Sequence, residues 1–511
     1  MPKDYSDQTP KISPHQDIAQ NGNPSNAPLG IFPDKIQQAR ISNYKFYSDL
    51  FFGEHFQAFN QKVSSEDFNK AYSVLRYVSV NFAGMITKIA ADMLFSEPIT
   101  LTAGENGDQD YLDALWNENN MDVQVYEGAL GNSYNGDDCW GIRIGPREPG
   151  DKKSSVIIEQ FDPSIYFPDL DRFNARAMPS AHNKMWVFKH QNKDYLRKEI
   201  HTSGKIKNKF YRMEADKIME EVQQEAAGVS GIKVSEDTNV PMPLIVHLPN
   251  WKTGNRYFGI SDYFDLQSIF FAINNRITKS DNILDAHSDP ILMVPPGVLD
   301  EKGRFKKKDH RVIEMGEGED GKPEYVVWDA SLENAFKEIE KLVEFIMMIG
   351  EVSPAIIGMD KNGAAESGRA LKFKLLRTIA KVARKKMYYN IALRRVLYIA
   401  QTIGKAHGIE MGGKKIKGEP TYPTLTFADG LPADDKESLE VETMAIDAGM
   451  TSQREAIKRY YGVDDKEADR LIEEIKKEKA VAMPNMDITK DLLTKMDPDK
   501  KMAKQPPATN Q

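Results

Sequence analysis

The chain has 511 residues, which is enough for two to four domains with a sizeable core. Its formal charge of −8 excludes a surface that is basic all over, so any face that binds nucleic-acid phosphates has to be local. A single cysteine, Cys139, excludes an internal disulfide and a cysteine-rich zinc site, and fits a reducing compartment.

Residues 1–30 are polar and rich in Pro, Asn and Gln, without the apolar stretch of a signal peptide. No window approaches about 18 uninterrupted apolar residues, so we expect no transmembrane helix. The composition therefore predicts a soluble intracellular protein, or a part of an intracellular assembly, with a disordered N-terminal arm over residues 1–30.

The first folded block, residues 31–260, is predicted to be α+β. Apolar spacing predicts helices over residues 35–53, 65–96 and 110–134, the second of them being one or two helices that end before Pro98. Alternating segments then predict strands over residues 140–144, 155–160, 185–190 and 244–248, a hairpin over 195–211 that turns at Ser203-Gly204, and a short exposed helix over 214–227.

A long amphipathic helix is predicted over residues 261–288. Ser261 can cap it, and Asp262 and Asp265 would lie in its first turn, where the helix dipole favours acids. Its apolar stripe consists of Leu266, Phe270, Ile273, Ile277 and Leu284, and the helix should end before Pro290.

A small strand-rich insert follows, with three short apolar runs over residues 291–294, 312–315 and 325–328. A basic cluster lies in its middle and consists of Arg304, Lys306, Lys307, Lys308 and Arg311. A second amphipathic helix over 331–350 carries the stripe Leu332, Phe336, Ile339, Val343 and Ile346. Two such helices can pack on each other and on copies of themselves.

The segment after the second helix combines a glycine-flanked loop, residues 352–367, with a very long basic helix over 368–408. No acid occurs between Ser367 and Ile409, whereas eleven lysines and arginines do. The charged face is either solvated or paired with acids on a neighbouring element. The predicted buried stripe consists of Leu375, Ile379, Val382, Met387 and Ile391.

The remaining chain is predicted to hold a strand over residues 421–427 and two or three helices, over 435–449, 452–461 and 465–480. A polar tail with several prolines, residues 481–511, is predicted to be disordered.

Chemical motifs are absent: there is no Walker A sequence, no G-x-G-x-x-G and no H-E-x-x-H. We interpret His247 and His287 as structural, Asp169 and Asp171 as loop acids without the spacing of an EF-hand, and Asp137-Asp138 as turn residues. We therefore expect no catalytic residues, no metal site and no cofactor, and the sequence favours a protein that is not an enzyme.

Several of these residues resemble tailed-bacteriophage portal proteins, most of all those of long-tailed phages. The run Gly259-Ile260-Ser261-Asp262-Tyr263, continued by Leu266, Asn274-Asn275, Ser280, Ile283-Leu284 and Pro290, is similar to the entry of the family's stem. A second match comprises Asn81, Ile86, Lys88, Ala91, Leu94-Phe95 and Glu97-Pro98-Ile99, although Ser96 stands where the family often has glycine. The order helix, β-insert, helix, loop, long helix is also similar, and the resemblance covers residues 35–480.

The resemblance implies a mainly α, α+β portal-type fold that assembles as a ring, usually of twelve subunits, at one capsid vertex. It implies the following parts: a wing over 31–260, stem helices over 261–288 and 331–351, a clip over 289–330, a tunnel loop over 352–366, a long basic helix returning to the wing over 367–430, and a crown over 431–480.

The same resemblance implies roles for three groups of residues. Met359, Asp360, Lys361, Asn362 and Gly363 would face DNA in the tunnel. Arg304, Lys306, Lys307, Lys308 and Arg311 would dock partners at the clip. Inter-subunit packing of the stem would use Leu266, Phe270, Ile273, Ile277, Leu332, Phe336, Ile339 and Val343.

The implied partners are other copies of the chain, the terminase large subunit, a head-completion or adaptor protein, the major capsid and scaffolding proteins, and double-stranded DNA in transit. The resemblance implies no membrane partner, and the implied location is the portal vertex of a virion assembled in the host cytoplasm. Two alternatives stay open: a phage nuclease or nucleotidyltransferase with an unrecognised site, and a capsid-associated minor protein without a channel.

Overall fold

The computed structural model describes residues 30–59, 77–95, 97–150, 153–171, 173–174, 176–288, 291–294, 312–314, 324–326, 332–359, 368–428, 435–463 and 465–482. These ranges form two compact units, divided between Leu431 and Pro432. The two terminal segments that we expect to be disordered, residues 1–30 and 481–511, lie almost entirely outside the described residues. Among the residues described, no helix is both long and apolar enough to cross a bilayer.

The first unit mixes helices and strands, as predicted, and begins with α1 (Lys35–Phe51) and α2 (His55–Phe59). Asp34 starts α1 with a capping box, in which its side chain accepts the N–H of Gln37 and the Gln37 side chain accepts the N–H of Asp34. The helix predicted over 110–134 is split into α5 (Gln109–Glu118) and α6 (Met121–Asn135), because Asn120 adopts a left-handed backbone conformation.

Of the one or two helices predicted over 65–96, the described residues show the second. Residues 60–76 lie outside the described part, and α4 spans Phe82–Phe95. Residues 77–81 are not helical, because their backbone groups bind another helix: the N–H of Val78 donates to Thr278 Oγ1 and that of Val80 to Asn274 Oδ1. The Asn81 side chain accepts the N–H of Gly84 and so opens α4.

A six-stranded antiparallel sheet has the order β4-β5-β6-β7-β8, with β9 added beside β7. Its strands are β4 (Tyr166–Pro168), β5 (His182–His190), β6 (Lys193–Thr202), β7 (Lys205–Glu214), β8 (Lys217–Val222) and β9 (Ser235–Asp237). The hairpin predicted at Ser203-Gly204 is confirmed, with Gly204 at a φ of 79°.

The short helix predicted over 214–227 is wrong. Residues 217–222 form β8, and only Gln224–Ala227 form a single 3-10 turn. A tight turn with Ala215 at positive φ folds the chain back, so that β8 pairs with β7 and satisfies its backbone groups in the ladder.

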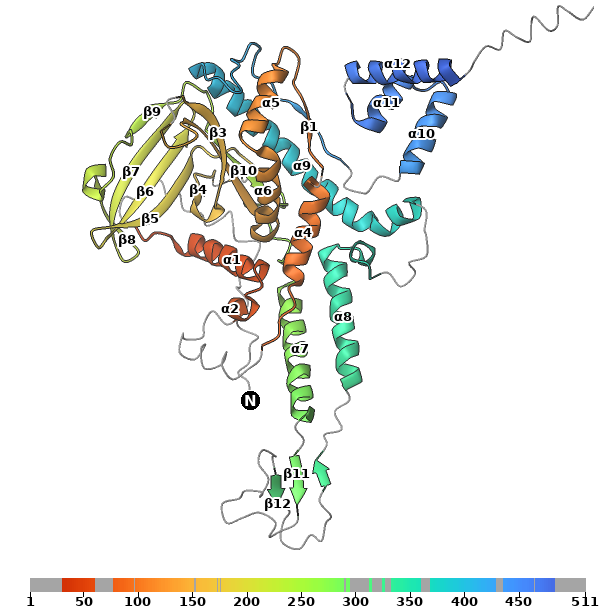
Figure 1. Cartoon of the computed structure of the whole chain (residues 1–511). Coiled ribbons are helices and arrows are strands. Elements are labelled where there is room, and N and C mark those ends of the chain that lie inside the picture. The colour runs from red at the N-terminus through yellow and green to blue at the C-terminus, as the bar shows by residue number, and fades with distance from the viewer. Residues whose placement is uncertain are drawn as a thin grey trace, which may run out of the picture. The chain divides into compact units, whose positions relative to one another are not determined.

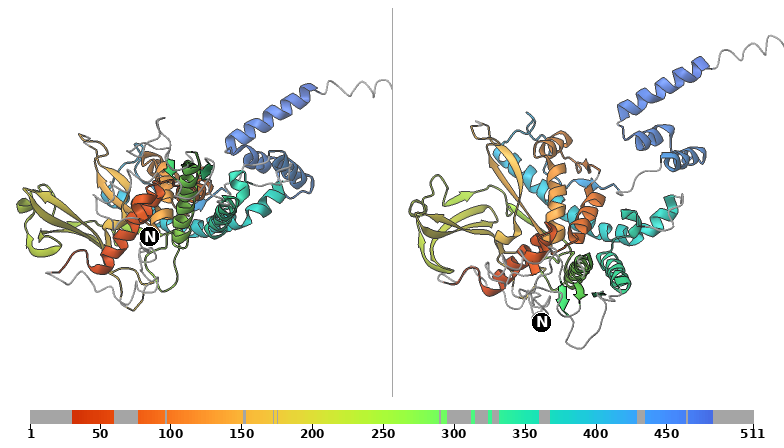
Figure 2. Two further views of the ribbon diagram at one scale, coloured as in Figure 1. Left: turned by 90° about the horizontal axis from the view of Figure 1, so that it is seen from below. Right: turned by 60° about the horizontal axis from the view of Figure 1, so that its bottom comes forward.

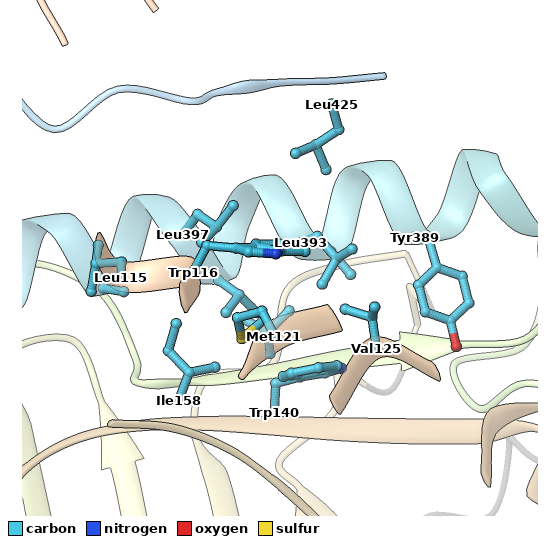
Figure 3. Close-up of a cluster of buried hydrophobic side chains, with 14 of the residues drawn as sticks. Leu115, Trp116, Met121, Val125, Trp140, Ile158, Tyr389, Leu393, Leu397 and Leu425 are labelled. Atoms are coloured by element: carbon cyan, nitrogen blue, oxygen red, sulfur yellow. The ribbon is translucent and has the colours of Figure 1, made fainter. Parts of the chain in front are cut away.

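A second sheet, of order β10-β2-β3, comprises β2 (Asp137–Gly145), β3 (Ser155–Phe161) and β10 (Ile245–Pro249). The long helix α9 (Gly368–His407) packs on this sheet. Figure 3 shows Leu393 and Leu397 of α9 over Met121 and Trp140, which belong to the largest buried apolar cluster. Burial of these side chains stabilises the unit by roughly 1.5–3 kcal/mol each.

The strand predicted over residues 421–427 is the shorter β14 (Thr424–Thr426), and it pairs with β1 (Thr100–Thr102). Its partner lies more than 300 residues earlier and was not predicted. This strand pair connects the segment after α9 with the segment after α4.

The helices α7 (Gln267–Ser288) and α8 (Leu332–Gly350) lie side by side (Figures 1 and 2). Between them in the chain lies a three-stranded sheet of β11 (Ile291–Val294), β12 (Val312–Glu314) and β13 (Glu324–Val326). The strand β11 is central, parallel to β12 and antiparallel to β13. The predicted helix–insert–helix order is confirmed.

In its described residues the second unit holds α10 (Asp435–Asp447), α11 (Gln453–Tyr461) and α12 (Asp465–Ala482), as predicted. Ser452 caps α11 by accepting the N–H of Glu455. Two bidentate pairs tie the helices together, Arg459 with Glu442 and Arg454 with Asp469.

Candidate functional site

The residues that lead into α7 form a closely packed junction with the β10-β2-β3 sheet. Asp137 Oδ1 accepts the N–H of Gly259 at 2.7 Å, and the N–H of Asn250 donates to the carbonyl of Gly136 at 2.8 Å. A Cβ at position 259 would collide with the Gly136 carbonyl oxygen, and one at position 136 would come within 2.6 Å of the Ser261 nitrogen. Only glycine allows this close approach of two backbone segments.

A buried ionic cluster lies beside this junction. Asp262 Oδ2 is 2.8 Å from the ammonium of Lys385 and 3.5 Å from that of Lys381, both on α9. Asp262 also accepts hydrogen bonds from the Ser133 hydroxyl at 2.6 Å and the Asn250 amide at 3.0 Å. The three charged side chains are at most 8% exposed, so this cluster is desolvated and fully partnered.

The charges of this cluster are set by burial and by one another. Burial by itself raises the pKa of Asp262, but the ammonium groups of Lys381 and Lys385 outweigh it and hold the pKa well below its usual range. Burial lowers the pKa of Lys385 to about 8, although Asp262 opposes that shift. Asp262 is therefore ionised throughout the physiological range.

Lys381 extends the cluster to the end of α8, because its ammonium donates to the carbonyl of Gly350 at 2.9 Å. The next residue, Glu351, pairs with Arg377 and Arg384 of α9. The N–H of Ser353 donates to Thr378 Oγ1 at 2.9 Å. The start of α7, the end of α8 and the middle of α9 are thus held together by charged and polar side chains.

The prediction that Ser261 caps a helix starting there is wrong. The chain runs through successive turns from Asp262 to Leu266, and α7 begins at Gln267. Ser261 Oγ instead accepts the N–H of Tyr263, and the Asp262 carboxylate turns inward to the lysines of α9. A buried ion pair outweighs the weaker attraction of an acid to a helix dipole.

The predicted stem stripe is largely an internal core. Leu266, Phe270 and Ile273 are fully buried in one chain, in a cluster with Tyr47 and Ile346. The prediction that these three side chains pack against a second subunit therefore needs correction, because none of their surface is exposed to contact another chain. The side chains of Ile277, Ile339 and Val343 pack against the same cluster and are partly buried. Leu332 is partly exposed, and Phe336 is 48% exposed.

The residues predicted to face DNA are described only in part. Pro354–Ile357 form a 3-10 turn that Gly358 ends at a φ of 71°, and Met359 is exposed. Asp360, Lys361, Asn362 and Gly363 lie outside the described residues, and so do Arg304, Lys306, Lys307, Lys308 and Arg311 of the insert.

The stripe predicted for the long helix mixes two faces. Leu375 and Val382 are buried, and Ile379 is packed against the same cluster, as expected. Met387 and Ile391 are 60% and 71% exposed and lie on the opposite side. The buried face continues instead through Tyr389, Leu393, Val396, Leu397 and Ala400.

The acids and the histidine near the junction make hydrogen bonds within the fold. His247 Nε2 lies 2.7 Å from Asp137 Oδ1, and the Tyr44 hydroxyl donates to Asp137 Oδ2 at 2.6 Å. Asp137 and Asp138 open β2 and are buried, so the prediction of turn residues is wrong for both. Across the described ranges, no group of three or more His, Cys, Asp or Glu side chains could hold a metal ion.

The chain was compared with curated protein sequences, solved structures and protein families. No curated protein sequence matches the chain. Two solved structures with 13% identity and a TM-score of 0.38 are the neck of the native GTA particle computed with C12 symmetry and the neck of the empty GTA particle computed with C6 symmetry. The first alignment covers 74% of this chain and 89% of that chain, and the second covers 75% and 90%.

A third solved structure, the virion of the native gene transfer agent (GTA) particle, is 13% identical with a TM-score of 0.35, covering 75% of this chain and 89% of that chain. The family model described as phage portal protein, SPP1 Gp6-like, matches residues 174–483. That match spans the large sheet from β5 onward, the α7–insert–α8 segment, α9 and the second unit. The chain belongs to the SPP1 Gp6-like family of phage portal proteins.

Proposed function

We propose that the chain is the portal vertex subunit of a tailed bacteriophage, and that twelve copies form a ring around a channel for double-stranded DNA. DNA would enter the procapsid through this channel during packaging and leave through it later. The observation that carries the proposal is the family match over residues 174–483, which includes every element from α7 to α9.

The segment 352–366 is proposed as the tunnel loop that lines the narrowest part of the channel. The junction of α7, α8 and α9 supports this, because it holds the chain firmly just before the loop, at Gly350 and Ser353. A net charge of −8 per chain makes the ring repel DNA in general, and screening limits that repulsion to about 8 Å at physiological salt. Lys361 would then supply weak, reversible phosphate contacts.

The insert between α7 and α8, residues 289–330, is proposed as the clip. Its small sheet is connected at both ends to the paired helices, which suits a projecting part that binds partners. The terminase large subunit would dock there during packaging, and head-completion or adaptor proteins afterwards. The basic residues Arg304, Lys306, Lys307, Lys308 and Arg311 would contact these partners.

Residues 31–260 and 367–430 are proposed as the wing, and residues 431–480 as the crown that faces the capsid interior. The major capsid and scaffolding proteins would contact this part of the ring. The proposed location is the virion, after assembly in the host cytoplasm.

Electron microscopy of the purified full chain tests the proposal. We expect closed rings with a central channel, with twelvefold symmetry in averaged images. Monomers under every assembly condition would contradict it. Metal-dependent DNA cleavage or ATP turnover by the pure ring, lost on changing a single carboxylate, would contradict the absence of catalysis.

A further inference from the structure

The helix α9 carries a second apolar face that is exposed in the part of the chain that the structure describes. Phe373, Leu376, Met387 and Ile391 are 66%, 61%, 60% and 71% exposed. At about 100° of rotation per residue they fall within an arc of roughly 60°, opposite the face that packs on the β10-β2-β3 sheet. They extend over about 27 Å of helix, because each residue adds about 1.5 Å.

This exposed stripe of α9 differs from scattered surface residues in its continuity. Ala380 and Ala383 lie between its two halves on the same side, and Arg384 at the edge of the stripe is paired with Glu351. A helix that is apolar on two opposite faces is ordinarily covered on both. The stripe is also presented rigidly, because Lys381 and Lys385 anchor the middle of the helix to Asp262.

The charge of α9 restricts what can cover this stripe. The 40 residues of α9 contain no acid. Arg395 lies one helical turn from Ile391, and Arg377, one turn from Phe373, is paired with Glu351. Packing of two α9 stripes across a twofold axis would place like charges against each other and be disfavoured. The covering surface should therefore be apolar, acidic at its border and different from α9.

The same chain offers such a surface on α8. Phe345, Met348 and Ile349 are 46%, 69% and 44% exposed and lie on one side of that helix, away from Ile346 in the core. Glu344 lies one turn before Met348, and Glu340 one turn before Glu344. Lys341, one turn before Phe345, pairs with Glu344 at 2.6 Å, so two acids and one lysine border this face. The chain thus presents two unlike apolar faces, one with a net acidic border and one on a helix without any acid.

We propose that the α9 stripe of one subunit packs against the Phe345–Ile349 face of α8 in the next copy of the chain. Such a contact joins two different surfaces and is heterologous, which is the arrangement that closes a ring by rotation. This inference rests on the proposed ring and names the side chains that hold neighbouring subunits together. It replaces Leu266, Phe270 and Ile273, whose burial excludes them.

The first test is assembly of the double variant Leu376→Glu/Met387→Glu. Both positions are exposed in one chain, so the fold should survive, while the new carboxylates would face Glu340 and Glu344 of the neighbour. We expect folded monomers with unchanged circular dichroism, and a chain concentration for half-assembly raised at least about tenfold. The matched control is Val123→Glu on α6, which is 57% exposed and should form rings normally.

The second test uses cysteine cross-linking, which is clean here because Cys139 is buried. Chains carrying Leu376→Cys are mixed with chains carrying Met348→Cys, or Met387→Cys with Phe345→Cys, and treated with a short bis-maleimide. We expect cross-linked dimers that contain one chain of each kind. Dimers formed by the Leu376→Cys chain alone would indicate an α9–α9 contact and overturn the inference.

The wild-type chain in the same assembly assay separates this inference from the proposed function. Wild-type rings that persist unchanged in the double variant leave the proposed function standing and overturn the interface. A variant that forms rings but no longer binds scaffolding or capsid protein also overturns the interface and leaves the proposed function standing. The α9 stripe would then bind scaffolding or capsid protein. If the wild-type chain never forms rings, both the proposed function and the proposed interface are contradicted.

Discussion

The ammonium of Lys385 lies 2.8 Å from the Asp262 carboxylate, and the two side chains are 5% and 3% exposed. The contact joins α9 to the turns that precede α7, across more than 120 residues of sequence. Asn250 of the β10 end and Ser133 of α6 complete the polar environment of Asp262. This desolvated ionic cluster therefore adds to the apolar core around Phe270 in fixing the α7–α8 pair against the rest of the first unit.

Replacing Asp262 with Asn should be strongly destabilising. The substitution leaves Lys381 and Lys385 buried without an opposite charge, which typically costs about 3–5 kcal/mol. Denaturant unfolding at a fixed chain concentration measures the effect. Asp265→Asn is the matched control, because Asp265 is exposed three residues away and should change stability by less than about 0.5 kcal/mol. Equal stability of the two variants would contradict a structural role for the ionic cluster.

Gly259→Ala should also disrupt the junction, for a steric reason. The added Cβ would collide with the carbonyl oxygen of Gly136 and come within 2.8 Å of the Asn250 nitrogen. We expect a loss of about 2–4 kcal/mol in the free energy of unfolding. Gly131→Ala in α6 has open space around its Cβ and should be neutral or stabilising by up to about 1 kcal/mol. Thermal melts of both variants provide the measurement.

Phe270→Ala and Phe336→Ala distinguish core from surface in the α7–α8 pair. Phe270 is fully buried, so its truncation should cost about 3–5 kcal/mol in the stability of the chain itself. Phe336 is 48% exposed, and its truncation should cost less than about 1 kcal/mol. If Phe270→Ala left the unfolding transition unchanged and only weakened rings, the assignment of Phe270 to the internal core would be wrong.

The buried Asp138 predicts a dependence of stability on pH. Burial raises the pKa of Asp138 from its usual value of 3.8 to about 7. Between these values the folded chain binds a proton that the unfolded chain releases, so this group makes stability fall as the pH rises from about 4 to 7. The total change is at most about 4 kcal/mol, at about 1.4 kcal/mol for each pH unit.

Asp138→Asn should remove this contribution, since an amide does not titrate in the range. Unfolding free energies of wild type and variant, measured at several pH values between 4.5 and 7.5, should diverge as the pH rises, with the variant the more stable at the upper end. Asp265→Asn, which is exposed, should keep the wild-type slope. Parallel curves for wild type and Asp138→Asn would show that Asp138 is ionised in the folded chain.

Deletion of residues 358–363 tests the proposed tunnel loop. The deletion begins after the contact of Ser353 with Thr378, so we expect rings to assemble in normal yield. DNA packaging or retention should fall, because the loop would no longer reach the DNA. Lys361→Ala in the intact loop isolates the charge and should have a smaller effect in the same packaging assay. Full packaging by the deleted chain would remove the role proposed for residues 352–366.

Most local elements were predictable, because they depend on short-range patterns. The alternation of residues 195–211 and the turn at Ser203-Gly204 predicted the β6–β7 hairpin, and the apolar spacing predicted α8 and α9 within one or two residues. The three short strands of the insert were predictable for the same reason. Within the candidate site, the glycines near Gly259 and the acid-free character of α9 were visible in the sequence.

Errors occurred where a distant segment competed with a local preference. Residues 217–222 have helix-forming side chains, yet pairing with β7 makes them a strand. Asp262 has the position of a first-turn acid, yet two lysines on α9 draw it inward and delay the start of α7. A period of 3.6 residues also cannot decide which of two apolar faces on α9 is buried, so Met387 was assigned to the wrong side.

The sequence by itself therefore determined the order of elements, the insert between two helices, the basic character of α9 and the membership of a known family, since each of these is encoded in residues close together in the chain. Only the tertiary structure decided which apolar residues are core and which remain exposed, and which lysines neutralise Asp262. Those outcomes depend on contacts between segments more than a hundred residues apart, where burial and charge pairing outweigh local propensity.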